Sequence, residues 1–209
     1  SANGSEDKIA VVVSMSKAEG LAPGFTVVRE DASNYTLGEK SLTINMQAGD
    51  LWGSGSNNLK NMFLYSKFDR DNVRAIVKAD NLPINESGQW DTGSFMFMKD
   101  EDNYITIGKK SHFAGIASVD ETNGSANEQG GSTSENAVTS AYLALTNDGS
   151  GKVSLDFKVD GGEWTHLRDL SSAMLGDDYD IGFGAWHTNA RGKSVTLSDF
   201  KVGTADMSL

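Results

Sequence analysis

The sequence predicts an all-β domain built as an antiparallel sandwich or barrel, and three observations lead to this prediction. Apolar and polar residues alternate with a period of two in one segment after another, as in strands that bury one face. Glycine- and aspartate-containing turn signals separate many of these segments. No long stretch keeps the 3.6-residue period of an amphipathic helix. Many short strands joined by tight turns are typical of sandwiches and barrels.

The expected strands follow one another along the whole chain. In order, they span residues 9–15, 24–29, 35–37, 41–46, 62–68, 73–79, 93–98, 104–107, 113–119, 141–146, 153–159, 164–167, 180–186 and 194–202. Strong hairpin signals are Asp-Gly-Ser-Gly at 148–151 and Asp-Gly-Gly at 160–162, because Asp and Gly tolerate positive φ. Residues 171–176 are expected to form one short helical turn.

We expect one domain over residues 9–203. Residues 1–8 are small and polar and are interpreted as a linker or a cloning remnant, and residues 204–209 as a C-terminal tail. No secretion signal is visible, so the chain is interpreted as a module of something longer. The segment 120–138 is expected to be a long surface insertion loop, since residues 120–136 contain no large apolar side chain. Loops of that length are either functional or disordered.

Charge and composition exclude several classes of function. Lys and Arg number 18 and Asp and Glu 29, a net charge of −11. This balance disfavours binding to nucleic acid and to anionic membrane surfaces, because both need clustered cations. Cysteine is absent, which excludes disulfides, thiolate catalysis and Cys-ligated metals. The longest strongly apolar run, residues 9–15, is far too short for membrane insertion.

Three groups of segments, in this order, carry a resemblance to a known family. They are GFTVVRED (24–31), NYTL (34–37) and SLTI (41–44); GSFMFM (93–98) and DNYITIG (102–108); and VDGGEW (159–164), IGFGAW (181–186) and VTLSDFKV (195–202). The order resembles concanavalin A-like, or laminin-G-like, β-sandwich domains. It is most similar to those on the C-terminal side of bacterial β-xylosidases and arabinofuranosidases, and to carbohydrate-binding modules of multimodular glycosidases. The resemblance implies an antiparallel two-sheet β-sandwich of jelly-roll type.

The resemblance also implies a function. We expect a monomeric, non-catalytic module that binds a glycan, an oligo- or polysaccharide, beside the linked catalytic domain of a bacterial glycosidase. Such a protein would be secreted or displayed on the cell surface. One alternative is a structural sandwich that braces a neighbouring catalytic domain. A second is a glycoside hydrolase or polysaccharide lyase on the same fold.

The sequence offers no catalytic constellation. Glycosidases of this fold need paired carboxylates, but no strand contains a Glu-x-Asp-x-Glu alternation. The acidic clusters at 69–71, 100–102 and 177–180 fall at expected turns. None of the three histidines lies in a nucleophile-elbow context. A lyase acting on an acidic substrate would need a basic cleft, which the net charge of −11 disfavours.

Trp186 leads the candidate carbohydrate-binding residues. In the strand 180–186, Gly182, Gly184 and Trp186 face away from the apolar residues. Glycine in a strand interior often marks the close approach of a ligand, so a bare strip beside one ring suits a sugar groove. In the alternative interpretation, the glycines relieve a bulge and the indole packs under a loop.

Other residues complete this preferred site. The same alternation places Tyr104 and Tyr142 on the outer faces of their strands, where they are expected to join Trp186. Asn189 and Arg191 follow in the next loop as polar partners for sugar hydroxyls.

A rival site contains Trp52 and Trp90. Both lie in loop-like segments rich in small or polar residues, 48–58 and 87–91, whereas Trp164 after the turn at 160–162 is expected to be a packing residue. Counting strands of alternating direction puts Trp52 and Trp90 at one end of the sandwich. The same count puts Trp186 at the other end with the insertion loop.

A structural calcium ion is a further expectation, because it is common in concanavalin A-like sandwiches. Asp69, Asp71, Asp100 and Asp102 are the candidate ligands, since calcium takes oxygen donors. Their spacing does not define a site.

Overall fold

The computed structural model describes residues 11–12, 15–17, 20–55, 57–130, 138–159, 161–187, 189 and 192–209. One sheet contains β1 (Val11–Val12), β5 (Tyr35–Leu37), β6 (Ser41–Asn45), β9 (Val73–Asp80), β14 (Ser140–Asn147), β15 (Lys152–Val159), β16 (Thr165–Ser171) and β18 (Ser194–Gly203). The other contains β4 (Phe25–Val28), β7 (Gln47–Ala48), β8 (Met62–Tyr65), β10 (Thr92–Asp100), β11 (Asn103–Lys110), β12 (Ala117–Thr122), β13 (Ser125–Gln129) and β17 (Asp180–His187). Smaller elements are the hairpin β2 (Ser16–Lys17) and β3 (Gly20–Leu21), and two 3-10 turns, η1 (Ala32–Asn34) and η2 (Ala173–Leu175).

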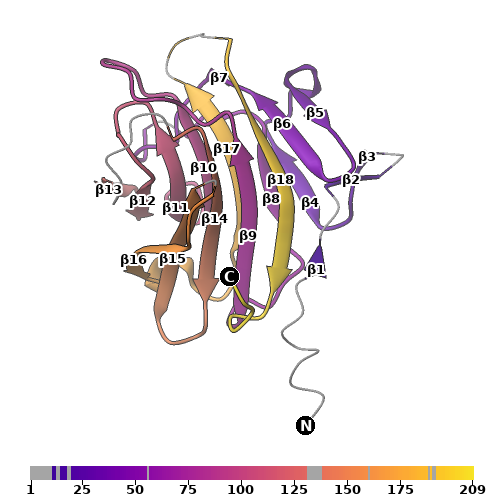
Figure 1. Ribbon diagram of the computed structural model, residues 1–209, viewed down its shortest axis with the longest axis vertical. Helices are drawn as coiled ribbons and strands as arrows, with labels where there is room; N and C mark the ends of the chain where they lie inside the picture. Colours follow the sequence, from indigo (N-terminus) through magenta and orange to yellow (C-terminus); the bar gives the residue numbers. More distant parts are fainter. Residues whose placement is uncertain are drawn as a thin grey trace.

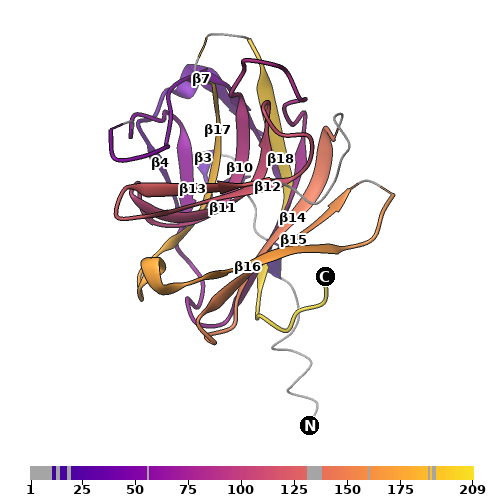
Figure 2. The ribbon, with the colours of Figure 1, turned by 90° about the vertical axis from the view of Figure 1, so that its left-hand side faces the viewer.

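The two sheets face each other as a sandwich (Figures 1 and 2). The first sheet has the order β16-β15-β14-β9-β18-β6-β5, with β1 paired to β18. The second has the order β13-β12-β11-β10-β17-β8-β4, with β7 paired to β17. The pairs are antiparallel apart from β7 with β17. The fold is therefore the all-β, two-sheet sandwich that the sequence predicts, and η2 lies within the expected helical turn.

One strand prediction is wrong at its start, and the structure gives the reason. Strand β12 begins at Ala117 rather than at residue 113, because the chain turns where Phe113 N–H donates to Lys110 O. Of the strand expected at 9–15, only Val11–Val12 is a described strand. Residues 1–10, and with them the expected linker, lie outside the described part of the chain.

The predicted loop at 120–138 is wrong as far as residue 129. Strands β12 and β13 form a hairpin in which Thr122 pairs with Ser125. Its two central residues, Asn123 and Gly124, have φ of 51° and 80°. Asn-Gly is the strongest short hairpin signal, since both residues accept the positive φ of a type I′ turn. Residues 131–137 lie outside the described chain.

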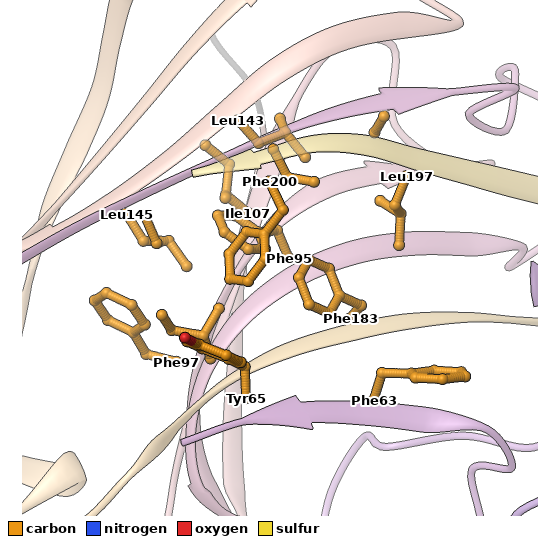
Figure 3. Packing of buried hydrophobic residues seen from close by; sticks show 14 of the residues in the cluster. Phe63, Tyr65, Phe95, Phe97, Ile107, Leu143, Leu145, Phe183, Leu197 and Phe200 are labelled. Carbon is orange, nitrogen blue, oxygen red and sulfur yellow. The ribbon is translucent and has the colours of Figure 1, made fainter. Parts of the chain in front are cut away.

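Aromatic side chains fill the space between the sheets (Figure 3). Phe95 on β10, Phe183 on β17 and Phe200 on β18 are each at most 1% exposed. The rings of Phe183 and Phe200 come from opposite sheets and meet edge to face, with centroids 4.9 Å apart. Burial of each such side chain stabilises the fold by roughly 1.5–3 kcal/mol.

A second apolar layer covers the outer face of the second sheet. There, Met96 on β10, Tyr104 on β11 and Trp186 on β17 pack against Leu51 and Leu59. The last two belong to the loop 49–61 between β7 and β8, so this loop folds back over the sheet. That fold-back places Asp50 and Trp52 beside the outer face of the second sheet, where they line a cavity. The helical segments of the described chain are single short turns, none of them able to cross a membrane.

Candidate functional site

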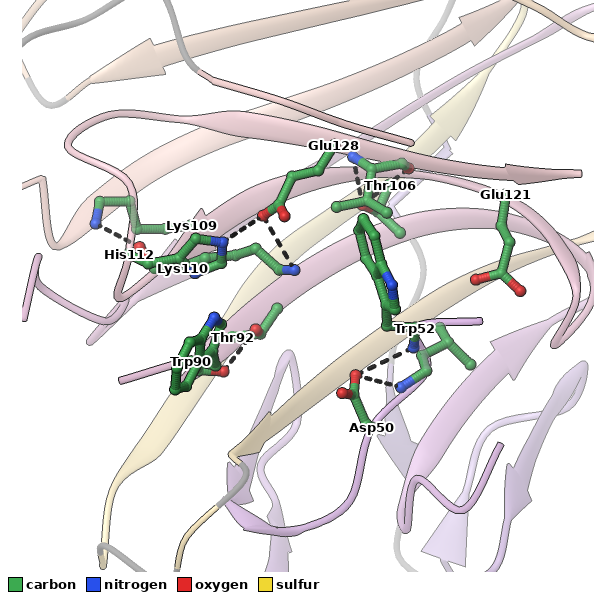
Figure 4. A network of polar contacts seen from close by, with 12 residues as sticks. Asp50, Trp52, Trp90, Thr92, Thr106, Lys109, Lys110, His112, Glu121 and Glu128 are labelled. Atoms are coloured by element: carbon green, nitrogen blue, oxygen red, sulfur yellow. Dashed lines mark hydrogen bonds and ion pairs between the residues drawn. The ribbon is translucent and has the colours of Figure 1, made fainter. Parts of the chain in front are cut away.

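A cavity of about 330 Å³ opens beside the loop 49–61 on the outer face of the second sheet (Figure 4). Its volume falls in the range of small-molecule sites. The lining side chains are aromatic, carboxylate, ammonium and hydroxyl groups: Asp50, Trp52, Trp90, Thr92, Lys110, His112, Glu128 and Trp186. They come from two loops, from the turn after β11, and from β10, β11, β13 and β17. The topology therefore gathers residues that are far apart in the sequence.

Trp52 stands on a backbone that side chains hold in place. Asp50 Oδ1 accepts the N–H groups of Leu51 and Trp52 at 2.7 and 3.1 Å. The next residue, Gly53, donates its N–H to Glu121 Oε1 at 2.8 Å. The indole is 39% exposed. Trp52 is thus fixed at its backbone while its ring stays available to a ligand.

Tyr104 and Glu121 lie beneath this loop and support it. Tyr104 donates its O–H to Glu121 Oε1 at 2.8 Å, and its oxygen lies 3.1 Å from Leu51 O. Both side chains are buried, and burial raises the pKa of each. Tyr104 lines a narrow crevice of about 10 Å³ below the cavity rather than the cavity itself. It reaches a ligand in the cavity only through the loop.

One wall of the cavity carries a cluster of charged and titratable groups. Glu128 Oε1 lies 3.3 Å from Lys110 Nζ and 2.7 Å from His112 Nε2. Lys110 Nζ also lies 5.5 Å from the centre of the Trp52 ring, a cation–π distance. Burial lowers the pKa of His112, and the charge of Glu128 opposes that shift. The Glu128 carboxylate thus lies between an ammonium group and an imidazole.

Trp90 forms the opposite wall. Its indole is 49% exposed, and its ring centre lies 6.2 Å from that of His112. Lys193 Nζ lies 2.6 Å from Glu86 Oε1 and 3.3 Å from Asp91 Oδ2, and so fastens the segment that carries Trp90 to the start of β18. The ring is exposed on a segment that is held at both sides of it.

Trp186 closes the floor of the cavity and is only 5% exposed. A Cβ atom added at Gly184 would lie 3.0 Å from Trp186 Cζ3 and 3.1 Å from Met96 Cε. The strip beside the glycines is therefore filled by the indole and a methionine instead of being open to a ligand. Of the two interpretations of this strand, the indole packed under a loop describes the structure, although one edge of the ring reaches the cavity.

The structure brings together some predicted site residues and separates others. Trp52, Trp90 and Trp186 line one cavity, so their predicted placement at opposite ends of the sandwich is wrong. Tyr142 lies on β14 in the other sheet, where its ring is 6.4 Å from that of Trp164. Asn189 is exposed, and Arg191 lies outside the described residues.

Five lining residues were not among the sequence candidates: Asp50, Thr92, Lys110, His112 and Glu128. Asp50 has a local signal, because an Asp side chain in a loop commonly accepts hydrogen bonds from backbone N–H groups within the next two residues, which makes an Asx-turn. No local sequence signal points to Lys110, His112 or Glu128. Glu128 comes close to the other two residues only because of the β12–β13 hairpin.

The four candidate calcium ligands do not form a site. Asp69 Oδ1 accepts the N–H of Asp71, and Asp100 Oδ1 accepts the N–H of Asp102, each within its own turn. Nowhere in the described chain do three or more Asp, Glu, His or Cys side chains gather in a way that could hold a metal ion. Asp69 and Asp100 instead stabilise the turns in which they lie.

Comparison with protein families and with curated proteins finds no match. Solved structures do match. The chain is similar to the GH43 protein BlXynB from Bacillus licheniformis, with a TM-score of 0.70 and 16% identity over 91% of this chain and 38% of that one. It is also similar to a functionally unknown protein from Saccharomyces cerevisiae, with a TM-score of 0.67 and 17% identity over 87% and 96% of the two chains.

A third similar structure is the exoplasmic/lumenal domain of VIP36 in a Ca²⁺/Man3GlcNAc-bound form. Its TM-score is 0.61, with 13% identity over 94% of this chain and 89% of that one. At such identities the likeness shows the fold alone, and that fold is a concanavalin A-like β-sandwich. The chain spans a little over a third of BlXynB, so it corresponds to one part of that longer protein.

Proposed function

We propose that this chain is a non-catalytic carbohydrate-binding module that holds a neutral glycan in the cavity between Trp52, Trp90 and Trp186. The observation that carries the proposal is the composition of that cavity. Three indole rings and one imidazole surround about 330 Å³, with oxygen acceptors and one ammonium donor between them. Flat aromatic faces next to a few polar groups are what a pyranose ring requires.

Aromatic and polar side chains would make different contacts with the sugar. The exposed indoles of Trp52 and Trp90 offer apolar faces to the C–H groups of a sugar ring. Asp50, Glu128 and Thr92 supply oxygen atoms that accept hydrogen bonds from hydroxyls, and Lys110 supplies a donor. The two carboxylates repel an acidic sugar, which favours a neutral ligand.

The carboxylates of the cavity support a binding role rather than a catalytic one. Asp50 Oδ1 is occupied by two backbone N–H groups of its own loop. Glu128 is shared between Lys110 and His112. Glu121, whose pKa is raised by burial, supports the loop from below and does not line the cavity. A glycosidase needs one carboxyl that is free to donate a proton and another that is free to attack or to activate water.

The setting we propose is an extracellular bacterial glycosidase in which the module is linked to a catalytic domain. The similarity to one part of the longer GH43 chain supports this arrangement. Linkage would raise the local concentration of the catalytic domain at its polysaccharide without any new catalytic group. The Man3GlcNAc-bound state of the VIP36 domain further supports sugar binding on this fold.

A bracing role is the second candidate, and one surface feature favours it. Ile84 is 43% exposed beside Pro83, on the rim of a shallow cavity of about 350 Å³ that Leu82 and Lys193 also line. A neighbouring domain could cover this patch. A module that only braces its neighbour would show no affinity for sugars on its own.

A glycan array with the whole chain tests the proposal. The panel includes neutral xylo- and manno-oligosaccharides, and every hit is repeated with Trp52→Ala and with Trp164→Ala as a matched control. We expect neutral glycans to bind, Trp52→Ala to lose them and Trp164→Ala to retain them. An array on which folded protein binds no neutral glycan contradicts the proposal and favours bracing.

A further inference from the structure

A second cavity, of about 260 Å³, lies on the outer face of the other sheet. Tyr142 on β14, Lys158 on β15 and Lys201 on β18 line it together with Trp164 and the segment 207–209. The two cavities are on opposite outer faces of the sandwich, so they form independent sites. Nothing in the first site depends on this one.

The register of the strands places aromatic and basic side chains side by side. Tyr142 pairs with Lys158 on one side and with Lys78 on the other. Lys158 Nζ lies 5.0 Å from the centre of the Tyr142 ring and 5.8 Å from that of Trp164. Lys78 Nζ lies 6.0 Å from the Tyr142 ring. Two rings and two ammonium groups therefore share one patch.

The charged side chains that line this cavity are positive, whereas the chain as a whole is negative. The protein has 29 acidic and 18 basic residues, yet no Asp or Glu side chain of the described residues lines this cavity, while Lys158 and Lys201 do. Neither lysine makes an ion pair with another described residue. The first cavity, in contrast, is lined by the carboxylates of Asp50 and Glu128.

We propose that this second cavity binds an acidic saccharide, one whose sugar units carry carboxylates. The face of a uronic acid ring would lie against Trp164 and Tyr142, and its carboxylate would pair with Lys158 and Lys201. An extended polyanion such as nucleic acid, or an anionic membrane, fits less well because it would also meet the surrounding surface of a chain with net charge −11. A short acidic oligosaccharide needs only the local cations.

Calorimetric titration of the whole chain with hexagalacturonic acid, and with xylohexaose as the neutral probe, tests this inference. Hexagalacturonic acid is expected to bind with an affinity that falls as salt is raised. Lys158→Gln is expected to weaken it at least about fivefold and Trp164→Ala at least about tenfold, the cost of losing a contact of about 1.4 kcal/mol. Lys152→Gln, at the exposed far end of the same strand, is the matched control and leaves the affinity unchanged.

Three results would overturn the proposal. In the first, folded protein does not bind hexagalacturonic acid. In the second, the Lys158→Gln variant binds it as tightly as wild type. In the third, the protein is retained on phosphatidylserine vesicles but does not bind the acid. The neutral probe separates the two sites. If Trp52→Ala abolishes xylohexaose binding and leaves hexagalacturonic acid binding intact, the two cavities act independently, whereas loss of both in Trp52→Ala contradicts a second site.

Discussion

The phenolic hydroxyl of Tyr104 lies 2.8 Å from Oε1 of Glu121, and both side chains are buried. The same carboxylate oxygen accepts the N–H of Gly53. Strands β11 and β12 thereby hold the loop that carries Trp52, although neither residue touches the cavity. The sugar-binding surface we propose depends on a hydrogen-bonded pair below it.

Tyr104→Phe tests that dependence. The substitution removes the hydroxyl and leaves the buried Glu121 carboxylate with one bond fewer, which should lower the free energy of unfolding by about 1–3 kcal/mol. Glycan affinity should fall as well, because the loop under Trp52 loses a support. Tyr142→Phe is the control, and should change neither the denaturant midpoint nor the affinity for a neutral glycan. Unchanged stability in Tyr104→Phe would show that the pair does not hold the loop.

Trp52 and Trp186 should respond differently to the same substitution. Trp186 is 5% exposed and packs in an apolar cluster, so Trp186→Ala should lower the free energy of unfolding by about 3–5 kcal/mol. Trp52 is 39% exposed, so Trp52→Ala should leave stability within about 1 kcal/mol and weaken glycan binding at least about tenfold. Thermal unfolding and calorimetric titration of both variants measure the difference. Equal destabilisation by the two would contradict the assigned roles.

Gly124→Ala should affect the cavity through the β12–β13 turn. Gly124 has φ of 80°, and an added Cβ would lie 2.8 Å from Ser54 Cβ in the site loop. The positive φ alone should cost roughly 1–2 kcal/mol of stability. Gly161→Ala has a similar φ of 75° and meets no atom within 4 Å, so it is the matched control. Both should lose stability, but only Gly124→Ala should also lose glycan affinity; a titration showing equal affinities would contradict the contact.

Lys109 should give the stability a distinctive pH dependence. Its side chain is buried and donates to Lys110 O and Phe113 O, and burial lowers its pKa to about 8 from 10.5. Between these values the unfolded chain binds a proton that the folded chain has lost. The contribution of Lys109 to the free energy of unfolding therefore rises as the pH increases from 8 to 10.5.

Lys109→Met isolates this effect. Urea unfolding of wild type and variant from pH 7 to 10.5 should show that wild type gains stability relative to the variant above pH 8. A difference that does not change with pH would mean that Lys109 titrates normally in the folded protein.

Period-two alternation predicts the sandwich well, because the core faces of the long strands are apolar. Phe183 falls on the apolar face predicted for the strand 180–186 and is fully buried. Period-two alternation does not predict the hairpin at 122–125, because β13 is an edge strand of mostly polar residues and so has no apolar–polar alternation. Its Asn-Gly pair was the local signal that could have identified it.

The candidate site is harder to predict than the fold. The rings of Trp52 and Trp186 meet one cavity because the loop 49–61 folds back over the sheet, and no local pattern encodes that path. Tyr104 alternates correctly to the outer face, but the folded-back loop buries it. Strand periodicity predicts on which face of the sheet a residue lies. It does not predict whether a distant loop covers that face and buries the residue.

The most direct measurement is the set of indole N–H signals in the nuclear magnetic resonance spectrum of isotope-labelled protein titrated with a neutral glycan from the array. Trp→Phe variants assign the signals of the four tryptophans, of which Trp164 lines the cavity on the opposite face of the sandwich. We predict that the signals of Trp52 and Trp90 shift together along one binding curve while that of Trp164 stays in place. Shifts confined to Trp164, or none for Trp52 and Trp90 at saturating glycan, would contradict binding in this cavity.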